Sequence, residues 1–211
     1  MEELEYIAPG DIEKKSFEII KKELSDMGVE LPPEYEDIII RVIHTTADFD
    51  FVKTLYFSDG VVQKARELIK EGAAIITDTK MALSGINKKK LASFNASALT
   101  FMSDEAVGEE AKTRGVTRAW VSMEHAARIS GKKIFAIGNA PTALFSLHEM
   151  MEKNIFSPDL VIGVPVGFVN VVQSKELFLS SGIPCIINKG RKGGSTVCAA
   201  IINAILKGMR R

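Results

Sequence analysis

The residues best suited to chemistry in this chain are grouped around His44. Segment 41–51 reads Arg-Val-Ile-His-Thr-Thr-Ala-Asp-Phe-Asp-Phe, so one imidazole follows an apolar run and precedes two hydroxyls and two carboxylates. An imidazole flanked by hydrogen-bonding groups is suited to transferring a proton near neutral pH. The pattern is also typical of a histidine that is merely hydrogen-bonded at a helix end, and this segment alone favours that second interpretation.

Three glycine-containing segments follow predicted strands and precede predicted helices: 138–142 (Gly-Asn-Ala-Pro-Thr), 163–168 (Gly-Val-Pro-Val-Gly-Phe) and 189–196 (Lys-Gly-Arg-Lys-Gly-Gly-Ser-Thr). The carboxyl ends of parallel strands meet at one edge of a sheet, where ligands bind. Glycine lets the backbone approach a ligand, and helix N-termini present free N–H groups to anions. Each segment alone is typical of an ordinary connection, but three at one edge predict an anion pocket.

Other chemistries lack their sequence patterns. No G-x-G-x-x-G follows a strand, no Walker pattern occurs, and no His/Cys/Asp set has zinc-ligand spacing. Ser195 lacks the G-x-S-x-G context of a serine hydrolase. Arg114 and Arg118 could bind a carboxylate or simply be solvated at a helix start, and His125 and His148 are predicted to be structural.

Short apolar runs alternate with helical patterns along most of the chain. Segments 34–44, 61–71, 117–130, 141–153, 170–181 and 194–208 have helical spacing, as does 11–27, and 80–83 reads as a short helical turn. Strands are predicted at 73–77, 92–100, 134–137, 160–164 and 185–187. This alternation indicates an α/β fold with parallel strands buried on both faces. Pro32-Pro33 and the acids that follow indicate a helix start, although the three isoleucines at 38–40 could also form a strand. If 34–44 is a helix, His44 lies at its C-terminus, where the dipole favours imidazolium.

Composition limits the class of protein. The 211 residues, 46% of them apolar, are enough for one domain or for one domain with an N-terminal extension. We expect a single domain spanning 1–211, with the acidic segment 1–50 as an integral part of it. The 27 basic and 27 acidic residues balance, which gives no electrostatic case for a nucleic-acid partner. The distribution is uneven, with 14 acids and 5 bases in 1–50 against 13 acids and 22 bases in 51–211. An acidic helical segment could therefore lie against a basic body, or that body could receive an anionic ligand.

The cysteines and the hydropathy of the chain predict its cellular compartment. Cys185 and Cys198 form neither a CxxC motif nor a disulfide framework. Residues 1–5 are acidic and lack the basic start of a signal peptide, and no window reaches the roughly 18 apolar residues of a membrane span. We therefore expect a cytoplasmic protein with no membrane partner.

Several motifs together resemble the precorrin-8X methylmutase family over about residues 8 to 206. The resemblance rests on these stretches: Ser-Phe-Glu-Ile-Ile at 16–20, Arg-Val-Ile-His at 41–44, Met-Ala-Leu-Ser-Gly-Ile at 81–86, Thr-Arg at 117–118, Ile-Gly-Asn-Ala-Pro-Thr-Ala-Leu at 137–144, Pro-Val-Gly-Phe-Val at 165–169, Ser-Lys at 174–175 and Gly-Arg-Lys-Gly-Gly-Ser at 190–195. The stretches at 137–144 and 165–169 are the most specific. The Thr-Thr-Ala-Asp form after His44 is more similar to the cobalt-precorrin-8 branch than to the aerobic one.

This resemblance implies a fold and an activity. The implied fold is a three-layer α/β/α sandwich around a doubly wound, mostly parallel sheet, with additional N-terminal helices. The implied enzyme is an isomerase of cobalamin biosynthesis that moves a methyl group from carbon eleven to carbon twelve of ring C. The family's catalytic histidine falls on His44, and its substrate-contacting serine and arginine fall on Ser16 and Arg118. A homodimer with its pocket near the subunit interface is also implied.

The chemistry agrees with this resemblance. A tetrapyrrole substrate carries acetate and propionate arms, which suit helix N-termini and basic side chains. We therefore predict substrate contacts from these residues: Ser16, Thr45, Arg118, Asn139, Thr142, Arg191, Lys192 and Ser195. The rearrangement needs a held macrocycle and a supplied proton, so we expect no metal site and no cofactor of the protein; cobalt, where present, belongs to the substrate.

Two alternatives remain open from the residues. An α/β enzyme that acts on a phosphorylated metabolite would use the same glycine segments as phosphate sites. A non-catalytic tetrapyrrole carrier would keep the arm-binding loops without depending on His44.

Overall fold

The structure is a computed structural model that describes residues 8–210. The strands are β1 (Leu55–Phe57), β2 (Ala74–Thr77), β3 (Ser97–Leu99), β4 (Lys133–Ile137), β5 (Leu160–Gly163) and β6 (Cys185–Asn188). They form one sheet in the order β1-β6-β5-β4-β2-β3. Every pairing is parallel except that of β1 with β6, where Leu55 lies opposite Asn188. The predicted α/β class with a mostly parallel sheet is confirmed.

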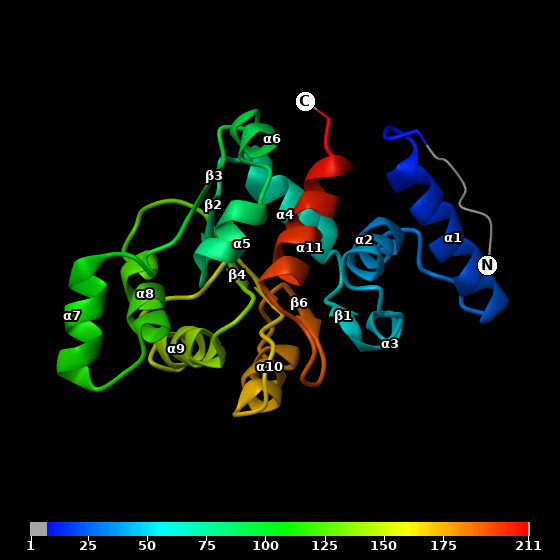
Figure 1. Ribbon diagram of the computed structural model, residues 1–211. Helices are drawn as coiled ribbons and strands as arrows, with labels where there is room; N and C mark the ends of the chain where they lie inside the picture. The colour runs from blue at the N-terminus through cyan, green and yellow to red at the C-terminus, as the bar shows by residue number, and fades with distance from the viewer. Residues whose placement is uncertain (1–7, 211) are drawn as a thin grey trace.

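Helices cover both faces of this sheet (Figure 1). They are α1 (Ile12–Asp26), α2 (Glu36–Thr46), α3 (Phe51–Thr54), α4 (Val61–Lys70), α5 (Lys80–Gly85), α6 (Lys88–Ala92), α7 (Glu105–Arg114), α8 (Arg118–Ala127), α9 (Pro141–Glu152), α10 (Val171–Leu179) and α11 (Ser195–Lys207). Helices α2, α4, α5 and α11 share one apolar core with the sheet, and α8, α9 and α10 share the other. The molecule therefore has the expected three layers.

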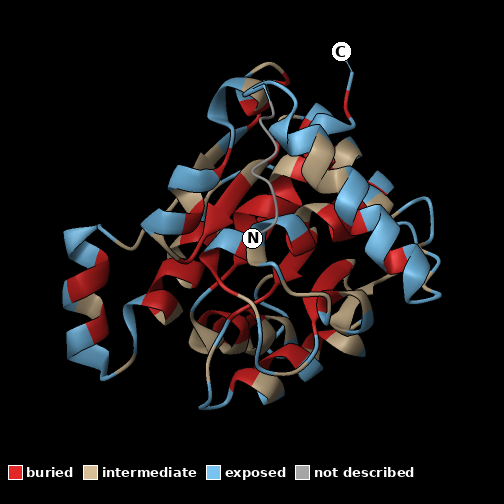
Figure 2. Ribbon diagram, turned by 45° about the vertical axis from the view of Figure 1, so that its right-hand side comes forward, coloured by how far each residue is buried: buried red, intermediate tan, exposed pale blue. Residues whose placement is uncertain are grey.

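The central strands supply both cores by alternation. Ile134 and Ala136 of β4 face the α11 side, whereas Phe135 and Ile137 face the α9 side. Successive side chains of a strand point to opposite faces, and both faces here are covered, so the strands are apolar throughout. Figure 2 shows them as the buried centre of the molecule.

The strand order reverses between β2 and β4. From β2 the chain passes to β3 on one side, and then to β4, β5 and β6 on the other. The carboxyl ends of β2 and β4 therefore diverge at a topological switch point, the position where open α/β sheets bind ligands. Asp78 follows β2 and Gly138 follows β4 at this point.

Several elements differ from the sequence-based expectation, among them the short helix α3, which was not predicted. The strand predicted at 92–100 is only 97–99, because 88–92 is a helix whose start is capped by the Asn87 side chain accepting from the Lys90 N–H. Helix α7 was not predicted; only Val107, Gly108 and Ala111 of it are buried, which is too weak an apolar pattern to detect. The edge strand β1 was also missed, because three half-buried residues carry no periodicity.

Two further predictions concern the ends and the thiols of the chain. The segment predicted not to be a signal peptide, 1–5, lies outside the described residues. Within 8–210, no helix has the length and apolar character needed to cross a membrane. Cys185 and Cys198 are both free and buried, as expected of cysteines that form no disulfide.

Candidate functional site at the carboxyl edge of the sheet

His44 lies in the last turn of α2, as predicted. Glu36 and Asp37 occupy the first turn of this helix, and Ala47 ends it in the left-handed conformation with φ of 52°. One side of α2 is buried, whereas His44 is exposed. The neighbouring Thr45 donates its hydroxyl proton to the carbonyl of Arg41 at 2.8 Å. The imidazole is therefore presented at the surface from a rigid helix end.

Within the described part of the chain, the His44 ring contacts one aromatic ring and has no hydrogen-bond partner. Among residues 8–210, no side chain or backbone group forms a hydrogen bond or ion pair with it. Its ring contact is with Phe17 of α1, at 5.3 Å between centroids and an interplanar angle of 77°. Ser16 precedes Phe17 and donates its hydroxyl to the carbonyl of Ile12 at 2.9 Å. The predicted pair Ser16 and His44 thus come from adjacent helices.

An ion-pair cluster joins the end of α2 to the glycine-rich loop before α11. The Lys192 ammonium lies 2.6 Å from a carboxylate oxygen of Asp48 and 2.6 Å from one of Asp50. The Lys192 hydrogen bond lowers the pKa of Asp48, and both carboxylates raise the pKa of Lys192. Lys192, predicted as a substrate contact, is therefore already paired, and these partly exposed ion pairs join the loop to the segment after His44.

The loops 164–170 and 189–194 form one connected platform. The Gly194 N–H donates to the carbonyl of Val164 at 2.8 Å. Beneath them, the buried Lys175 donates to the carbonyls of Gly190 and Lys192, both at 2.8 Å. Burial lowers the pKa of Lys175 to about 8. Because backbone carbonyls hold this ammonium, the loop conformation is set from inside the protein.

This platform exposes an aromatic ring beside a cation. Phe168 has 82% of its surface exposed, and Val169 has 77%. The Arg191 guanidinium lies 5.5 Å from the centroid of the Phe168 ring and forms no ion pair among the described residues. The arrangement offers a flat apolar surface next to a positive charge, which suits a planar ligand with anionic substituents.

The junction after β4 differs from the prediction of free N–H groups. The buried carboxylate of Asp78 accepts the N–H groups of Gly138, Asn139 and Ala140 at 2.9, 2.8 and 2.6 Å. Burial raises the pKa of Asp78, against the opposing effect of these three bonds. The backbone here therefore binds an internal anion, and only the exposed Asn139 side chain remains available to a ligand.

Hydroxyl pairs connect the remaining predicted residues. Thr142 of α9 shares a 2.7 Å hydrogen bond with Thr117, the residue that caps α8 just before Arg118. Ser195, at the start of α11, shares a 2.8 Å hydrogen bond with Thr79. Arg118 is exposed and has no ion pair among residues 8–210. These residues line the same sheet edge as the platform, so the structure brings most predicted contacts to one side.

Two weaker candidates have structural roles. Arg114 pairs with Glu110 at 2.6 Å and also with Glu124, so its charge is neutralised. His125 pairs with Glu110 at 2.8 Å. These ion pairs disfavour the interpretation of Arg114 as a carboxylate-binding residue of the site. They support the predicted structural role of His125.

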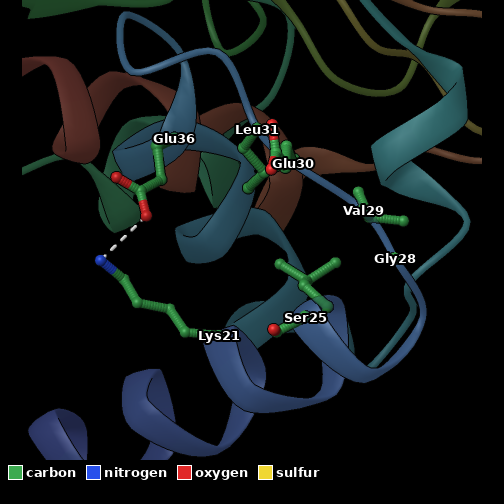
Figure 3. A pocket seen from close by; sticks show the side chains of 8 residues that line it. Lys21, Ser25, Gly28, Val29, Glu30, Leu31 and Glu36 are labelled. Carbon is green, nitrogen blue, oxygen red and sulfur yellow. Dashed lines mark ion pairs between the residues drawn. The ribbon is translucent and has the colours of Figure 1, made fainter.

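Four cavities formed by the described residues are not lined by His44. One of about 420 Å³ lies between the end of α1 and the start of α2. Figure 3 shows the ion pair of Lys21 with Glu36 at this cavity, and its charged atoms are 2.9 Å apart. This cavity is lined by Glu36, which lies about two turns of α2 before His44. Another, of about 90 Å³, lies beside Phe17 and Arg41 and is too small for a large ligand. No group of three or more His, Cys, Asp or Glu side chains in 8–210 is placed to hold a metal ion.

A family model for precorrin-8X methylmutase matches residues 11–208. The chain belongs to this family. Cobalt-precorrin-8 methylmutase of Salmonella typhimurium is 44% identical over 210 residues and covers 96% of both chains. Precorrin-8X methylmutase of Pseudomonas aeruginosa is 37% identical and covers 96% of this chain and 97% of its own. A solved precorrin-8X methylmutase from Thermus thermophilus superposes with a TM-score of 0.82 at 33% identity, covering 93% and 96% of the two chains.

Membership makes this chain an enzyme, an isomerase of cobalamin biosynthesis that catalyses an intramolecular methyl migration. The resemblance stated from the motifs is therefore confirmed for family, fold and activity class.

Sequence reasoning about this methylmutase missed two buried charges that organise the site. Asp78 directly follows the strand predicted at 73–77, so a carboxylate at a carboxyl strand end was the available signal. Lys175 lies inside a helical pattern, where its burial could not be read from the sequence. Both charges are compensated by backbone groups of the two glycine segments, which is a purely tertiary arrangement.

Proposed function

We propose that this methylmutase moves the methyl group from carbon eleven to carbon twelve of ring C in precorrin-8 or its cobalt form, with His44 as the general acid. The observation that supports the proposal best is the exposed imidazole at a helix end, tied through Lys192 to a platform that presents Phe168 and Arg191. A proton donated to the macrocycle would draw the migrating methyl group toward the protonated system. Since substrate and product are isomers, a proton gained at one position must be lost at another.

We propose that Arg118 and Arg191 bind carboxylate arms of the substrate. Both residues are exposed and lack ion pairs among the described residues, unlike Arg114 and Lys192, although the Arg118 guanidinium lies against Gly108 of α7. The hydroxyl and amide groups proposed to supplement them belong to Ser16, Thr45, Asn139 and Thr142. Ser195, also predicted as a contact, is buried and already bonded to Thr79, which favours a structural role for it. Lys192 now has a better-supported role in fixing the loop than in contacting an arm directly.

No step of this proposal requires a protein-bound cofactor. The chain supplies binding, orientation and a proton, and cobalt is treated as part of the substrate. The relatives from Salmonella typhimurium and Priestia megaterium, 44% and 41% identical, are both named cobalt-precorrin-8 methylmutases. We propose the cobalt form as the preferred substrate; comparison of kcat/KM for cobalt-loaded and metal-free precorrin-8 tests it, and equal or reversed values would contradict it.

The acid role is tested by His44→Ala. We expect loss of the absorption change that accompanies rearrangement, while binding of the tetrapyrrole stays within a fewfold of the original affinity. His148→Ala is the matched control, since that histidine lies in α9 beside Glu152 and Phe178. Near-normal turnover by His44→Ala would refute the acid assignment. Binding without conversion by the unaltered protein would instead support the tetrapyrrole carrier.

The arm contacts are tested by Arg118→Ala and Arg191→Ala. Charge-assisted pairs contribute roughly 1.5–3 kcal/mol, so each change should weaken macrocycle binding about tenfold or more. Arg128→Ala serves as the control, because Arg128 is exposed and directly follows α8. Unchanged affinity in both variants would refute the proposed arginine contacts to the substrate arms. Competition by inorganic phosphate would instead favour an enzyme that acts on a phosphorylated metabolite.

We also propose a cytoplasmic homodimer whose site is completed at the subunit interface. Support comes from the buried free thiols, which suit a reducing compartment, and from two half-exposed isoleucines on α1, Ile12 and Ile19. Seven residues apart, they lie on one side of the helix next to Ser16. A second subunit could cover this face and enclose the otherwise open surface around His44.

A further inference from the structure

His44 lacks the partner that usually orients a catalytic imidazole. Histidines that move protons are commonly held by a hydrogen bond from their second ring nitrogen to a carboxylate or carbonyl. No such bond reaches His44 from residues 8–210, although Asp48 and Asp50 follow closely in sequence, because both of these carboxylates bind Lys192. The group that remains against the imidazole is the ring of Phe17, in an edge-to-face arrangement.

The Phe17 ring is itself held by two cations. The Arg41 guanidinium lies 4.7 Å from its centroid, and the Lys207 ammonium lies 5.2 Å from it. Both cations bind Glu13, one turn before Phe17 on α1: Arg41 Nη1 at 2.5 Å and Lys207 Nζ at 3.0 Å. These hydrogen bonds, from Arg41 first and Lys207 second, lower the pKa of Glu13 to about 2. The carboxylate is therefore charged at neutral pH and keeps both cations beside the ring.

This arrangement joins three helices from distant parts of the chain. Glu13 and Phe17 come from α1, Arg41 and His44 from α2, and Lys207 from the end of α11. Arg41 and His44 lie three residues apart on α2, so one side chain of α1 can contact both. Helix α1 packs mainly against α2. The ion pair of Glu13 with Lys207 adds a second connection, from α1 to the end of α11.

We infer that Phe17 is a positioning residue for His44, and that Glu13, Arg41 and Lys207 hold Phe17 in place for this purpose. The inference rests on the proposed acid role of His44. An exposed imidazole without a hydrogen bond would sample several rotamers, and contact with a fixed ring restricts it to the orientation in which it can deliver a proton. Phe17 thereby gives the N-terminal helix a function in the reaction beyond packing.

The test compares Phe17→Leu, Phe17→Tyr and Leu24→Ala. Leucine fills most of the space without an aromatic ring, and tyrosine keeps the ring. Leu24 is buried on the same helix and supports α1 packing away from His44, so its truncation reports loosening of α1 alone. We expect kcat of Phe17→Leu to fall about tenfold with KM changed less than about twofold, because a small misplacement of a catalytic group affects the chemical step. Phe17→Tyr should recover most of the rate, and Leu24→Ala should retain it.

A second readout does not depend on activity. The chain has 3 histidines, so the His44 imidazole resonances can be assigned by their disappearance in His44→Ala. They should shift in Phe17→Leu, which removes the neighbouring ring current, and stay nearly unchanged in Leu24→Ala.

Each outcome is decisive. Wild-type kcat together with unmoved His44 resonances in Phe17→Leu would overturn the inference, as would an equal loss of kcat in Phe17→Leu and Leu24→Ala. If His44→Ala itself retained turnover, the proposed acid role would fail first, whatever the Phe17 variants do.

Discussion

At the scale of single residues, a buried carboxylate occupies the place where the sequence predicted an anion site. Asp78 binds the three consecutive N–H groups at the start of the β4–α9 junction, and thereby fixes the backbone that carries Asn139 and Thr142. The switch point of the sheet is in this sense already filled by the protein's own anion. An anionic ligand at this junction would then have to rely on side chains rather than on these backbone groups.

We predict that Asp78→Asn lowers the free energy of unfolding by roughly 2–3 kcal/mol, because an amide offers fewer acceptor positions and turns a donor toward the buried N–H groups. Urea unfolding followed by circular dichroism measures this. Asp104→Asn is the control: Asp104 caps α7 through one N–H at the surface, where asparagine caps equally well, so its stability should barely change. Equal stabilities of the two variants would show that the Asp78 bonds contribute nothing beyond a surface cap.

At the scale of elements, two loops act as one unit because glycine allows their close approach. Gly193 has φ of +153°, and a Cβ there would lie 2.1 Å from the carbonyl oxygen of Val164. That contact is with backbone, so a side chain at 193 must displace one loop from the other. The platform with Phe168 and Arg191 depends on this approach.

We predict that Gly193→Ala weakens tetrapyrrole binding about tenfold or more, because the displaced loop carries Arg191 away from Phe168. Fluorescence or absorbance titration with the macrocycle measures the affinity. Gly182→Ala is the matched control, since Gly182 has φ of +74° with open space around it, and so tests left-handed strain without a clash. If both variants bound the macrocycle as the unaltered protein does, the two loops could not be acting as a recognition platform.

At the scale of the whole molecule, the exposed apolar side chains of α1 and the open surface around His44 both favour a second subunit. Figure 1 places α1 at the periphery beyond α2, and only Ile20 and Leu24 of α1 are buried. A helix with so little buried surface, and with Ile12 and Ile19 half exposed, is incompletely covered in one chain.

We predict that light scattering at micromolar concentration gives about twice the mass of one chain. Ile19→Glu should shift the measured mass toward that of one chain and lower turnover in parallel, because the substitution would bury a charge at the interface. Ile155→Glu is the control: Ile155 is 69% exposed and follows α9, a helix that Figure 1 shows on the opposite side of the molecule from α1. A monomeric protein with full activity would exclude a site shared between subunits.

The fold was largely predictable because its signals are local. Strands buried on both faces read as continuous apolar runs, and the acids of the first turn and the apolar spacing of α2 placed His44 at a helix end. Elements with weak local signals were missed: β1 has three residues, and α7 buries only a narrow side. The motifs also carried the family, because side-chain identities in the loops between elements are set by the reaction rather than by packing.

What the sequence by itself determined was therefore most of the order of elements, the family, and a candidate imidazole at a helix end. The tertiary structure alone decided which polar groups remain free for a ligand. Lys192 is paired with Asp48 from 144 residues away, and the N–H of Gly138 with Asp78 from 60 residues away. Periodicity and capping signals extend over a few residues, whereas satisfaction of a buried or charged group depends on whichever distant segment folding brings beside it. The contact of Phe17 with His44 arises in the same way, from the packing of one helix against another.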